Sequence, residues 1–356
     1  MRDLLSMTIE EMKQFAGQLG EKPFRGKQIY AWLNRGVCDF DEMTDLSLSL
    51  RQKLENGLRN GDFTIGGCRV ADVQKDDTDG TRKFLFELGQ DDGDRDFVEG
   101  VFMKYRYGNT LCVSSQIGCR MGCRFCASAL GGFVRNLNAG EMLGQLLAAE
   151  KYTGEEINHI VVMGMGEPFD NYENVSKFLR LLHDEAGKNM SYRNMTVSTS
   201  GIVPMIDRFA EDFPQVNLAI SLHRLTDEGR SAIMPINRKY PLDELLAAAR
   251  RYTDKTHRRI TFEYTLIRGE NDSDEDVELI RKRLGGMLCH VNLIPLNKVE
   301  ETGFDGSTRS RAEEIAAALE SAGIPATVRR ELGGEIDGAC GQLRRISSCP
   351  NTSFSL

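Results

Sequence analysis

The stretch IGCRMGCRFCAS, residues 117–128, places three cysteines in one short loop. Cys119, Cys123 and Cys126 follow a C-x3-C-x2-C spacing, and the nearest other cysteine, Cys112, lies in a predicted strand. A zinc ribbon needs two separated pairs of ligands, which this loop does not supply. Three thiolates can instead hold a 4Fe–4S cluster and leave one iron open to a small-molecule ligand. The spacing therefore predicts an iron–sulfur cluster with an open position, and structural zinc is the alternative.

The segments around this loop alternate between strand-like and helix-like patterns. A strand at 110–116 precedes the loop, and the alternation continues to the segment IPATVRRE at 324–331. Such alternation is typical of parallel βα units in an open sheet or a barrel. Polar or glycine-rich tetrads follow four of the strands: MGEP (165–168), STSG (198–201), SLHR (221–224) and PLNK (295–298). Because active sites of barrels lie at the C-terminal ends of strands, we expect these tetrads to converge on one ligand.

The chain before the loop divides into two further parts. Thr8 and Glu11 form a capping box at the start of a helical module, with further helices expected after Pro23 and at 45–58. The segments 81–89 and 96–108 flank an acidic loop and predict a β-hairpin. We therefore expect an accessory helical domain at 1–60 that contacts RNA, a linker and hairpin at 61–108, a barrel at 109–335 and a C-terminal loop at 336–356.

Composition excludes some classes of protein. The 356 residues are 40% hydrophobic with no apolar run of about 18 residues, so we expect no membrane span. The N-terminus lacks the apolar core of a signal peptide, and a cytoplasmic location is the expectation. The formal net charge of −8 argues weakly against a nucleic-acid partner, but bases gather in short runs such as KPFRGKQ at 22–28. A basic face on an acidic protein is therefore possible.

The motifs together resemble a known family. A C-x3-C-x2-C loop after the first strand of a βα array resembles the radical S-adenosylmethionine (SAM) superfamily. The ordered set of motifs resembles the RlmN/Cfr family of adenine methyltransferases over about residues 20 to 345. This set consists of LCVSSQIGCRMGCRFCAS, GGFVRNL, VVMGMGEP, VSTSGIVP, LAISLH, MPIN, HVNLIPLN and DGACGQL. The resemblance implies an α/β fold, a partial (βα)6 TIM-type barrel, with a [4Fe-4S] cluster and SAM as cofactors.

The resemblance also assigns residues to roles. Cys119, Cys123 and Cys126 match the cluster ligands. Cys340 matches a cysteine that is itself methylated, Cys112 the second catalytic cysteine, and Glu99 a proton acceptor. The positions that match SAM contacts are Gly166, Glu167, Ser198, Ser221, Leu222, His223 and Asn297.

The implied reaction is methylation of carbon 2 of adenosine in 23S rRNA and, next to the anticodon, in tRNA. One SAM methylates Cys340, and a second yields a 5′-deoxyadenosyl radical that takes a hydrogen from the new methyl group. The carbon radical adds to adenine, Glu99 removes the carbon-2 proton, and Cys112 releases the product by forming a disulfide with Cys340. Gly338, Ala339 and Gly341 suit a loop that changes position between these steps.

Two other functions are open at this point. A Cfr-type enzyme shares the same cysteines and methylates carbon 8, although CASALGGFVRNL favours carbon 2. A metal-stabilised RNA-binding protein without catalysis is the other. The expected partners are 23S rRNA, tRNA and a small electron-donor protein such as flavodoxin, with no membrane and a monomeric state. Candidate phosphate contacts are the KPFRGKQ run, Lys104, Arg106, Arg329, Arg330, Arg344 and Arg345, and Cys38, Cys68, Cys289 and Cys349 receive no role.

Overall fold

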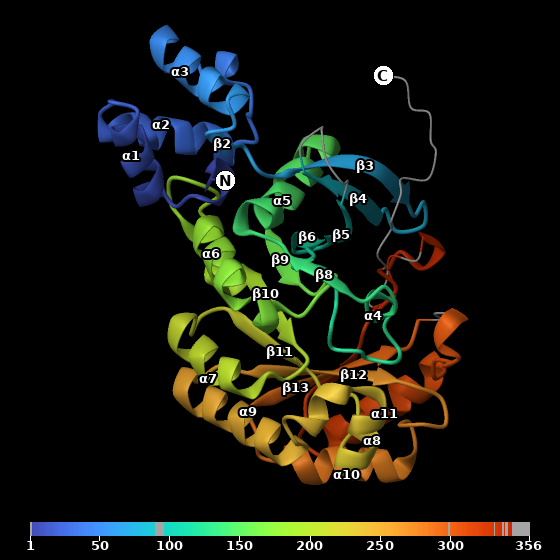
Figure 1. The fold of residues 1–356 in the computed structure, drawn as a ribbon. Coiled ribbons are helices and arrows are strands. Elements are labelled where there is room, and N and C mark those ends of the chain that lie inside the picture. The colour runs from blue at the N-terminus through green and yellow to red at the C-terminus, as the bar shows by residue number, and fades with distance from the viewer. Residues whose placement is uncertain are drawn as a thin grey trace.

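The computed structural model describes residues 2–89, 96–297, 300–330, 332–336, 338 and 341–343. Its described part is built on a ten-stranded sheet with the order β14-β13-β12-β11-β10-β9-β6-β5-β4-β3. Figure 1 shows the curved sheet with helices outside it and a separate group of helices at the N-terminus. This α/β architecture agrees with the expectation from the sequence.

Seven strands of the sheet are parallel and form the barrel portion. They run in chain order as β6 (Gly108–Cys112), β9 (His159–Val162), β10 (Met195–Thr199), β11 (Asn217–Ser221), β12 (Ile260–Leu266), β13 (Cys289–Pro295) and β14 (Ala326–Val328). Six of them are followed by helices, as expected, and the short β14 closes the series. The central strands are largely buried because helices cover one face and the barrel interior the other.

The barrel helices cover the outer face of the parallel strands (Figure 1). They are α5 (Ala139–Thr153), α6 (Tyr172–His183), α7 (Val203–Asp212), α8 (Asp227–Ile233), α9 (Leu242–Thr256), α10 (Asp274–Leu284) and α11 (Arg309–Ser321). Asn138 and Ser273 begin α5 and α10 with capping boxes. Most of α5 is buried because it packs against α6, β3 and the N-terminal segment.

Antiparallel strands extend the sheet beyond β6. The expected hairpin is present as β4 (Arg82–Leu88) and β5 (Asp96–Tyr105), which pair antiparallel along the whole of β4. β5 also pairs with β6, so the hairpin continues the main sheet instead of standing apart from it. The edge strand β3 (Cys68–Lys75) was not expected from the sequence, because it is polar and half-exposed.

The N-terminal helices form a small module as predicted. They are α1 (Ile9–Gln18), α2 (Pro23–Asn34) and α3 (Leu48–Arg59), and the Thr8–Glu11 capping box is confirmed. Strands β1 (Arg2–Asp3) and β2 (Phe63–Thr64) pair at the base of the module. Ser6 joins this base to α5, since its hydroxyl accepts a hydrogen bond from the Gly140 amide at 2.7 Å. None of the described helices is long and apolar enough to cross a membrane.

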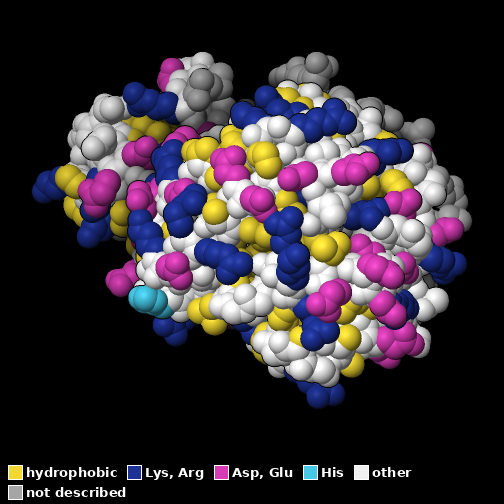
Figure 2. All heavy atoms as spheres, turned by 90° about the horizontal axis from the view of Figure 1, so that it is seen from below, with side chains coloured by type: hydrophobic (Ala, Val, Ile, Leu, Met, Phe, Trp, Pro, Cys, Tyr) yellow, Lys and Arg dark blue, Asp and Glu magenta, His cyan; other side chains and the backbone are white. Residues whose placement is uncertain are grey.

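Positively and negatively charged side chains both lie on the surface. Figure 2 shows one face, on which Lys and Arg side chains lie among Asp and Glu side chains. Many of these charges are paired, such as Arg251 with Asp207 at 2.7 Å and Lys255 with Glu211 at 2.7 Å. On this face the acidic overall charge therefore does not appear as a single patch.

Candidate active site

A two-stranded ribbon holds the cysteine loop at both ends. β7 (Gln116–Gly118) enters the loop, and β8 (Phe133–Asn136) leaves it after the short helix α4 (Ala127–Leu130). Gly118 has a φ of +69°, and a Cβ there would lie 1.7 Å from the Gly132 carbonyl oxygen. This position therefore requires glycine both for its left-handed backbone and for the close approach of the two strands.

The residues just before the loop fasten it to the turn that follows β9. The Ser114 hydroxyl accepts from the Met165 amide at 2.8 Å and donates to the Glu99 carbonyl at 2.6 Å. The Gln116 side-chain oxygen accepts from the Glu167 amide at 2.8 Å. Two of the motifs singled out in the sequence are thus joined by buried hydrogen bonds, which fix the cysteine loop over the end of the barrel.

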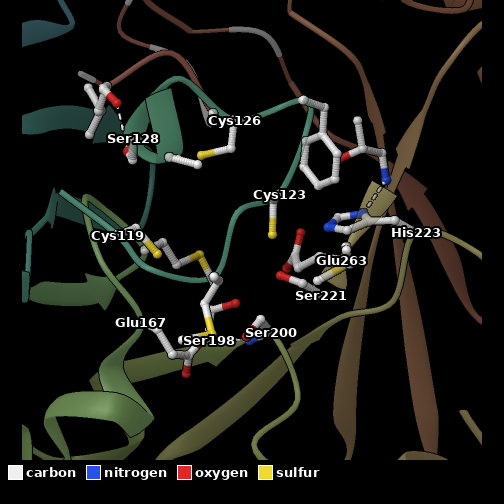
Figure 3. A pocket seen from close by; sticks show the side chains of 18 of the residues that line it. Cys119, Cys123, Cys126, Ser128, Glu167, Ser198, Ser200, Ser221, His223 and Glu263 are labelled. Atoms are coloured by element: carbon white, nitrogen blue, oxygen red, sulfur yellow. Dashed lines mark hydrogen bonds between the residues drawn. The ribbon is translucent and has the colours of Figure 1, made fainter. Parts of the chain in front are cut away.

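These segments enclose one cavity at the C-terminal ends of the parallel strands (Figure 3). The predicted residues that line it are Cys119, Cys123, Cys126, Gly166, Glu167, Ser198, Ser221, His223 and Asn297. Figure 3 shows the three cysteines on one side, with Glu167 and Ser198 below them and His223 and Ser221 opposite. Leu222 does not line this cavity: it is fully buried, and its amide donates to the Glu263 carbonyl at 3.0 Å. The four tetrads therefore converge as expected.

The cysteine loop fits an iron–sulfur cluster better than a single ion. No three Cys, His, Asp or Glu side chains of the described chain converge closely enough to hold one metal ion. The thiols instead surround a common space, as they would if each bound a different iron (Figure 3). Burial raises the pKa of Cys119 to about 12 and that of Cys123 well above its usual value. The loop would therefore release protons on binding iron, because the ligand form is the thiolate.

Glu167 is held rigidly beneath the cysteine loop. Its carboxylate accepts hydrogen bonds from the Ser200 amide at 2.7 Å, the Thr199 hydroxyl at 2.7 Å and the Phe169 amide at 3.0 Å. Burial raises its pKa, and these hydrogen bonds oppose the rise by stabilising the charged form. The side chain links the ends of β9 and β10 and offers negative charge to a cationic ligand group.

His223 lies on the opposite wall in a left-handed backbone conformation, with a φ of +57°. Its Nδ1 accepts a hydrogen bond from the Thr265 amide at 2.9 Å, so the neutral ring carries its proton on Nε2. Burial, with a further contribution from Arg230, lowers its pKa to about 3. The ring packs edge-on against Phe125 of the cysteine loop, with centroids 4.9 Å apart. His223 therefore presents a neutral N–H donor and an aromatic surface.

Arg230 is a structural feature that the sequence analysis missed. This fully buried side chain donates to the carbonyl oxygens of Ser200 at 2.6 Å, Ser221 at 2.9 Å and Leu222 at 3.2 Å. It also donates to the Asn237 side chain at 3.0 Å, which gives the MPIN motif a role. Nothing in the sequence around this arginine indicates that it is buried. The neighbouring MPIN motif, at 234–237, was the nearest feature noted in the sequence.

A second cavity adjoins the first. Cys112 lies at the end of β6 and lines it together with Val101, its partner on β5. Five residues border both cavities: Met163, Ile294, Asn297, Arg329 and Leu343. Glu99 is buried on the same face of β5, two residues before Val101, and its carboxylate lies 3.6 Å from the Lys83 ammonium. It lines neither cavity.

Cys340 lies outside the described residues, but its neighbours are placed. Gly341 lines the first cavity, and its carbonyl accepts a hydrogen bond from the Ala127 amide at 2.8 Å. The Leu343 carbonyl accepts from the Ser128 hydroxyl at 2.6 Å. Gly338 lines the second cavity. The C-terminal segment is thus bound to the helix that follows Cys126, more than two hundred residues away in sequence.

Family models match two regions of the chain. Residues 2–59 match the ribosomal RNA large subunit methyltransferase N-terminal domain, and residues 113–280 match the radical SAM superfamily. The second region contains the cysteine loop and the ends of β9 to β12.

Individual relatives match almost the entire chain. A protein of Clostridium perfringens (strain SM101 / Type A), named "Probable dual-specificity RNA methyltransferase RlmN", is 49% identical over 97% of each chain. A protein of the same name from Caldanaerobacter subterraneus subsp. tengcongensis is 50% identical over 97% of this chain and 98% of its own. The crystal structure of a radical SAM methyltransferase from Sphaerobacter thermophilus matches with a TM-score of 0.90 and 44% identity, covering 97% of this chain and 99% of its own.

Proposed function

Because this chain belongs to the RlmN family of radical SAM RNA methyltransferases, we propose that it methylates carbon 2 of adenosine in 23S rRNA and in tRNA next to the anticodon. Family members use a [4Fe-4S] cluster and SAM, and the dual specificity is part of the name that the relatives carry. The non-catalytic alternative is not supported, since the relatives along the whole chain are methyltransferases.

The residues of the first cavity would hold the two cofactors. Cys119, Cys123 and Cys126 would bind the cluster, which supplies one electron to cleave SAM when both are bound. The turn Gly166–Glu167 would receive the ammonium group of SAM, because its carboxylate is fixed and negatively charged. His223 would donate its Nε2 proton to an acceptor atom of SAM, with Ser198, Ser221 and Asn297 as further polar contacts and Leu222 as a backbone contact.

The second cavity would hold the reacting thiols. In this proposal the Cys340 thiolate accepts a methyl group from SAM, and the Cys112 thiolate later attacks the Cys340 sulfur to release the methylated RNA. The resulting disulfide needs two electrons from a reductant before the next turnover. Glu99 is proposed as the base for the carbon-2 proton; because the carboxylate lies outside both cavities, it would have to reach the base from the strand beside Cys112.

One observation carries this proposal: Gly341 and Gly338, on either side of Cys340, line the cluster-side cavity and the Cys112 cavity respectively. A methyl carrier must meet SAM in one place and the second thiol in the other, and these two cavities adjoin.

The experiment combines peptide and nucleoside mass spectrometry. We expect a 14-dalton adduct on Cys340 of the wild-type protein purified with its cluster. Wild-type protein should convert adenosine to 2-methyladenosine in tRNA and 23S rRNA fragments. Exclusive formation of 8-methyladenosine would instead support the Cfr-type alternative, and an unmodified Cys340 in SAM-replete protein would contradict the carrier role.

The remaining expectations form part of the same proposal. Residues 1–60 would act as an accessory domain that contacts RNA, 61–108 as linker and hairpin, 109–335 as the catalytic barrel and 336–356 as the carrier loop. A flavodoxin-like protein would supply electrons to a monomeric enzyme in the cytoplasm, where the RNA substrates and reducing conditions are found.

A further inference from the structure

A buried carboxylate lies in the first cavity without an assigned ligand. Glu263 belongs to β12, where it pairs with Ser221 of β11 and Asn292 of β13. It lines the cavity although only 7% of its surface is exposed. One carboxylate oxygen accepts a hydrogen bond from the Asn292 side chain at 2.8 Å. Within the described chain the other oxygen receives no hydrogen bond, so it is available to a donor in the cavity (Figure 3).

Arg329 supplies a positive charge that acts on the Glu263 carboxylate. It follows β14, its amide donates to the Leu293 carbonyl at 2.8 Å, and its side chain is half-buried. Its positive charge favours the ionised form of Glu263, whose pKa burial raises. Arg329 borders both cavities, whereas Glu263 borders the first alone. Arg329 therefore lies where the two cavities meet, and Glu263 lies in the first cavity.

A ligand at this junction needs contacts that SAM does not make. SAM needs the cysteine loop and the strand ends of the first cavity, while the target base must also come within reach of Cys112 in the second. An ionised carboxylate only accepts hydrogen bonds, and a guanidinium only donates them. Adenine offers an exocyclic amine as donor and ring nitrogens as acceptors, so its edge complements this pair.

We propose that Glu263 and Arg329 recognise the target adenine, with Glu263 accepting a hydrogen bond from the exocyclic amine and Arg329 donating to a ring nitrogen. The proposal rests on the proposed function, since it requires an adenosine substrate. It makes Glu263 a specificity-determining residue: a base with a carbonyl at position 6 would bring an acceptor against a buried carboxylate, which is unfavourable. Arg329, one of the candidate phosphate contacts, would instead contact the base.

The test compares two RNA hairpins of the anticodon arm, one with adenosine and one with inosine at the target position. Wild-type protein should methylate adenosine and reject inosine. In Glu263→Gln the neutral amide weakens the bond to the amine, so methylation of adenosine should slow about tenfold. Because the amide can turn to donate to a carbonyl, the preference for adenosine over inosine should fall by at least about tenfold.

Methylation of Cys340 without RNA separates this role from SAM binding. Glu263→Gln should methylate Cys340 and bind SAM as the wild type does. Thr261→Val, on the same face of β12 but in neither cavity, serves as the matched control and should keep the wild-type base preference. An unchanged base preference in Glu263→Gln, or a loss of Cys340 methylation equal to the loss on RNA, would overturn the proposal. Failure of the wild type on adenosine would instead contradict the proposed function.

The variant Arg329→Gln tests the role proposed for Arg329. We expect slower adenosine methylation, unchanged Cys340 methylation and an unchanged salt dependence of RNA affinity, because the base carries no charge. If the slope of log affinity against log salt decreases by the amount expected for one phosphate contact, Arg329 binds the RNA backbone. That result would refute its part of the proposal.

Discussion

Arg230 joins the ends of neighbouring strands from a position with no exposed surface. Burial lowers its pKa to about 10, so the guanidinium still carries its charge at neutral pH. The negative charge of Asp227 and hydrogen bonds to three carbonyl oxygens compensate for the lost hydration. The residue therefore fixes the backbone around Ser200 and Ser221 before any ligand binds, which places the cavity wall.

Replacing Arg230 should destabilise the fold. In Arg230→Met the carbonyl oxygens and the Asn237 side chain lose their shared donor, and the free energy of unfolding should fall by about 3–5 kcal/mol. Arg251→Met, which breaks the exposed pair with Asp207, should cost no more than about 1 kcal/mol. Urea unfolding followed by circular dichroism measures both. Equal stability of the two variants would mean that the buried guanidinium is not needed to hold the strand ends.

At the scale of elements, the cysteine loop depends on the ribbon that closes it. Gly118 and Gly154 have nearly the same backbone, with φ of +69° and +68°, but a Cβ at Gly154 would meet nothing within 4 Å. Both alanine variants carry the left-handed penalty of about 1 kcal/mol. Gly118→Ala must also separate β7 from β8, so we expect it to bind iron and sulfide at least tenfold more weakly, at a further cost of about 1.4 kcal/mol or more. Anaerobic reconstitution with iron and sulfide analysis measures this, and equal iron content in both variants would contradict it.

The contact between α4 and the C-terminal segment can be tested in the same way. Ser128→Ala removes the donor to the Leu343 carbonyl and leaves a buried acceptor unpaired, at a cost of about 1–3 kcal/mol. We expect a smaller fraction of methylated Cys340 at unchanged iron content, measured by peptide mass spectrometry. Ser321→Ala, which loses a bond to Ala317 on the exposed side of α11, is the control. Loss of iron in Ser128→Ala would mean that the contact supports the cluster loop instead.

Sequence alone predicted the elements better than the contacts between them. The βα alternation, the hairpin and the Thr8 cap depend on local patterns, and they are present. The convergence of the tetrads followed from the rule that parallel strands end at one edge. Glu263 and Arg230 could not be found in this way, because their burial depends on which strands become neighbours. Roles that came from the family resemblance, such as that of Cys340 as methyl carrier, remain predictions.

At the scale of the whole molecule, the N-terminal module offers basic and aromatic groups to solvent. Lys22 and Lys27 flank the start of α2 and are exposed, and Phe24 between them is 49% exposed with the Arg25 guanidinium 4.8 Å from its ring centroid. Aromatic faces with nearby cations bind single-stranded RNA by stacking and charge. We therefore expect the start of α2 to contact RNA, although the protein as a whole is acidic.

Reversal of these charges should affect RNA binding without affecting the chemistry of SAM. In the double variant Lys22→Glu and Lys27→Glu, we expect the RNA affinity to fall at least tenfold. The slope of log affinity against log salt should decrease by about 1.4, because two phosphate contacts in single-stranded RNA are lost. SAM cleavage and Cys340 methylation without RNA should stay at wild-type levels, since no residue of α2 lines the first cavity and α2 lies apart from α4 and the barrel strands (Figure 1).

The matched control reverses the same number of charges elsewhere. Lys255→Glu and Lys282→Glu alter exposed positions on α9 and α10, on the side of the molecule away from α2 (Figure 1). This variant has the same net charge as the first, so any general repulsion of RNA by an acidic protein acts equally on both. If the two variants lose affinity equally, the α2 surface makes no specific contact and the accessory module has another role. If the α2 variant alone loses affinity and salt dependence, the module guides RNA to the barrel.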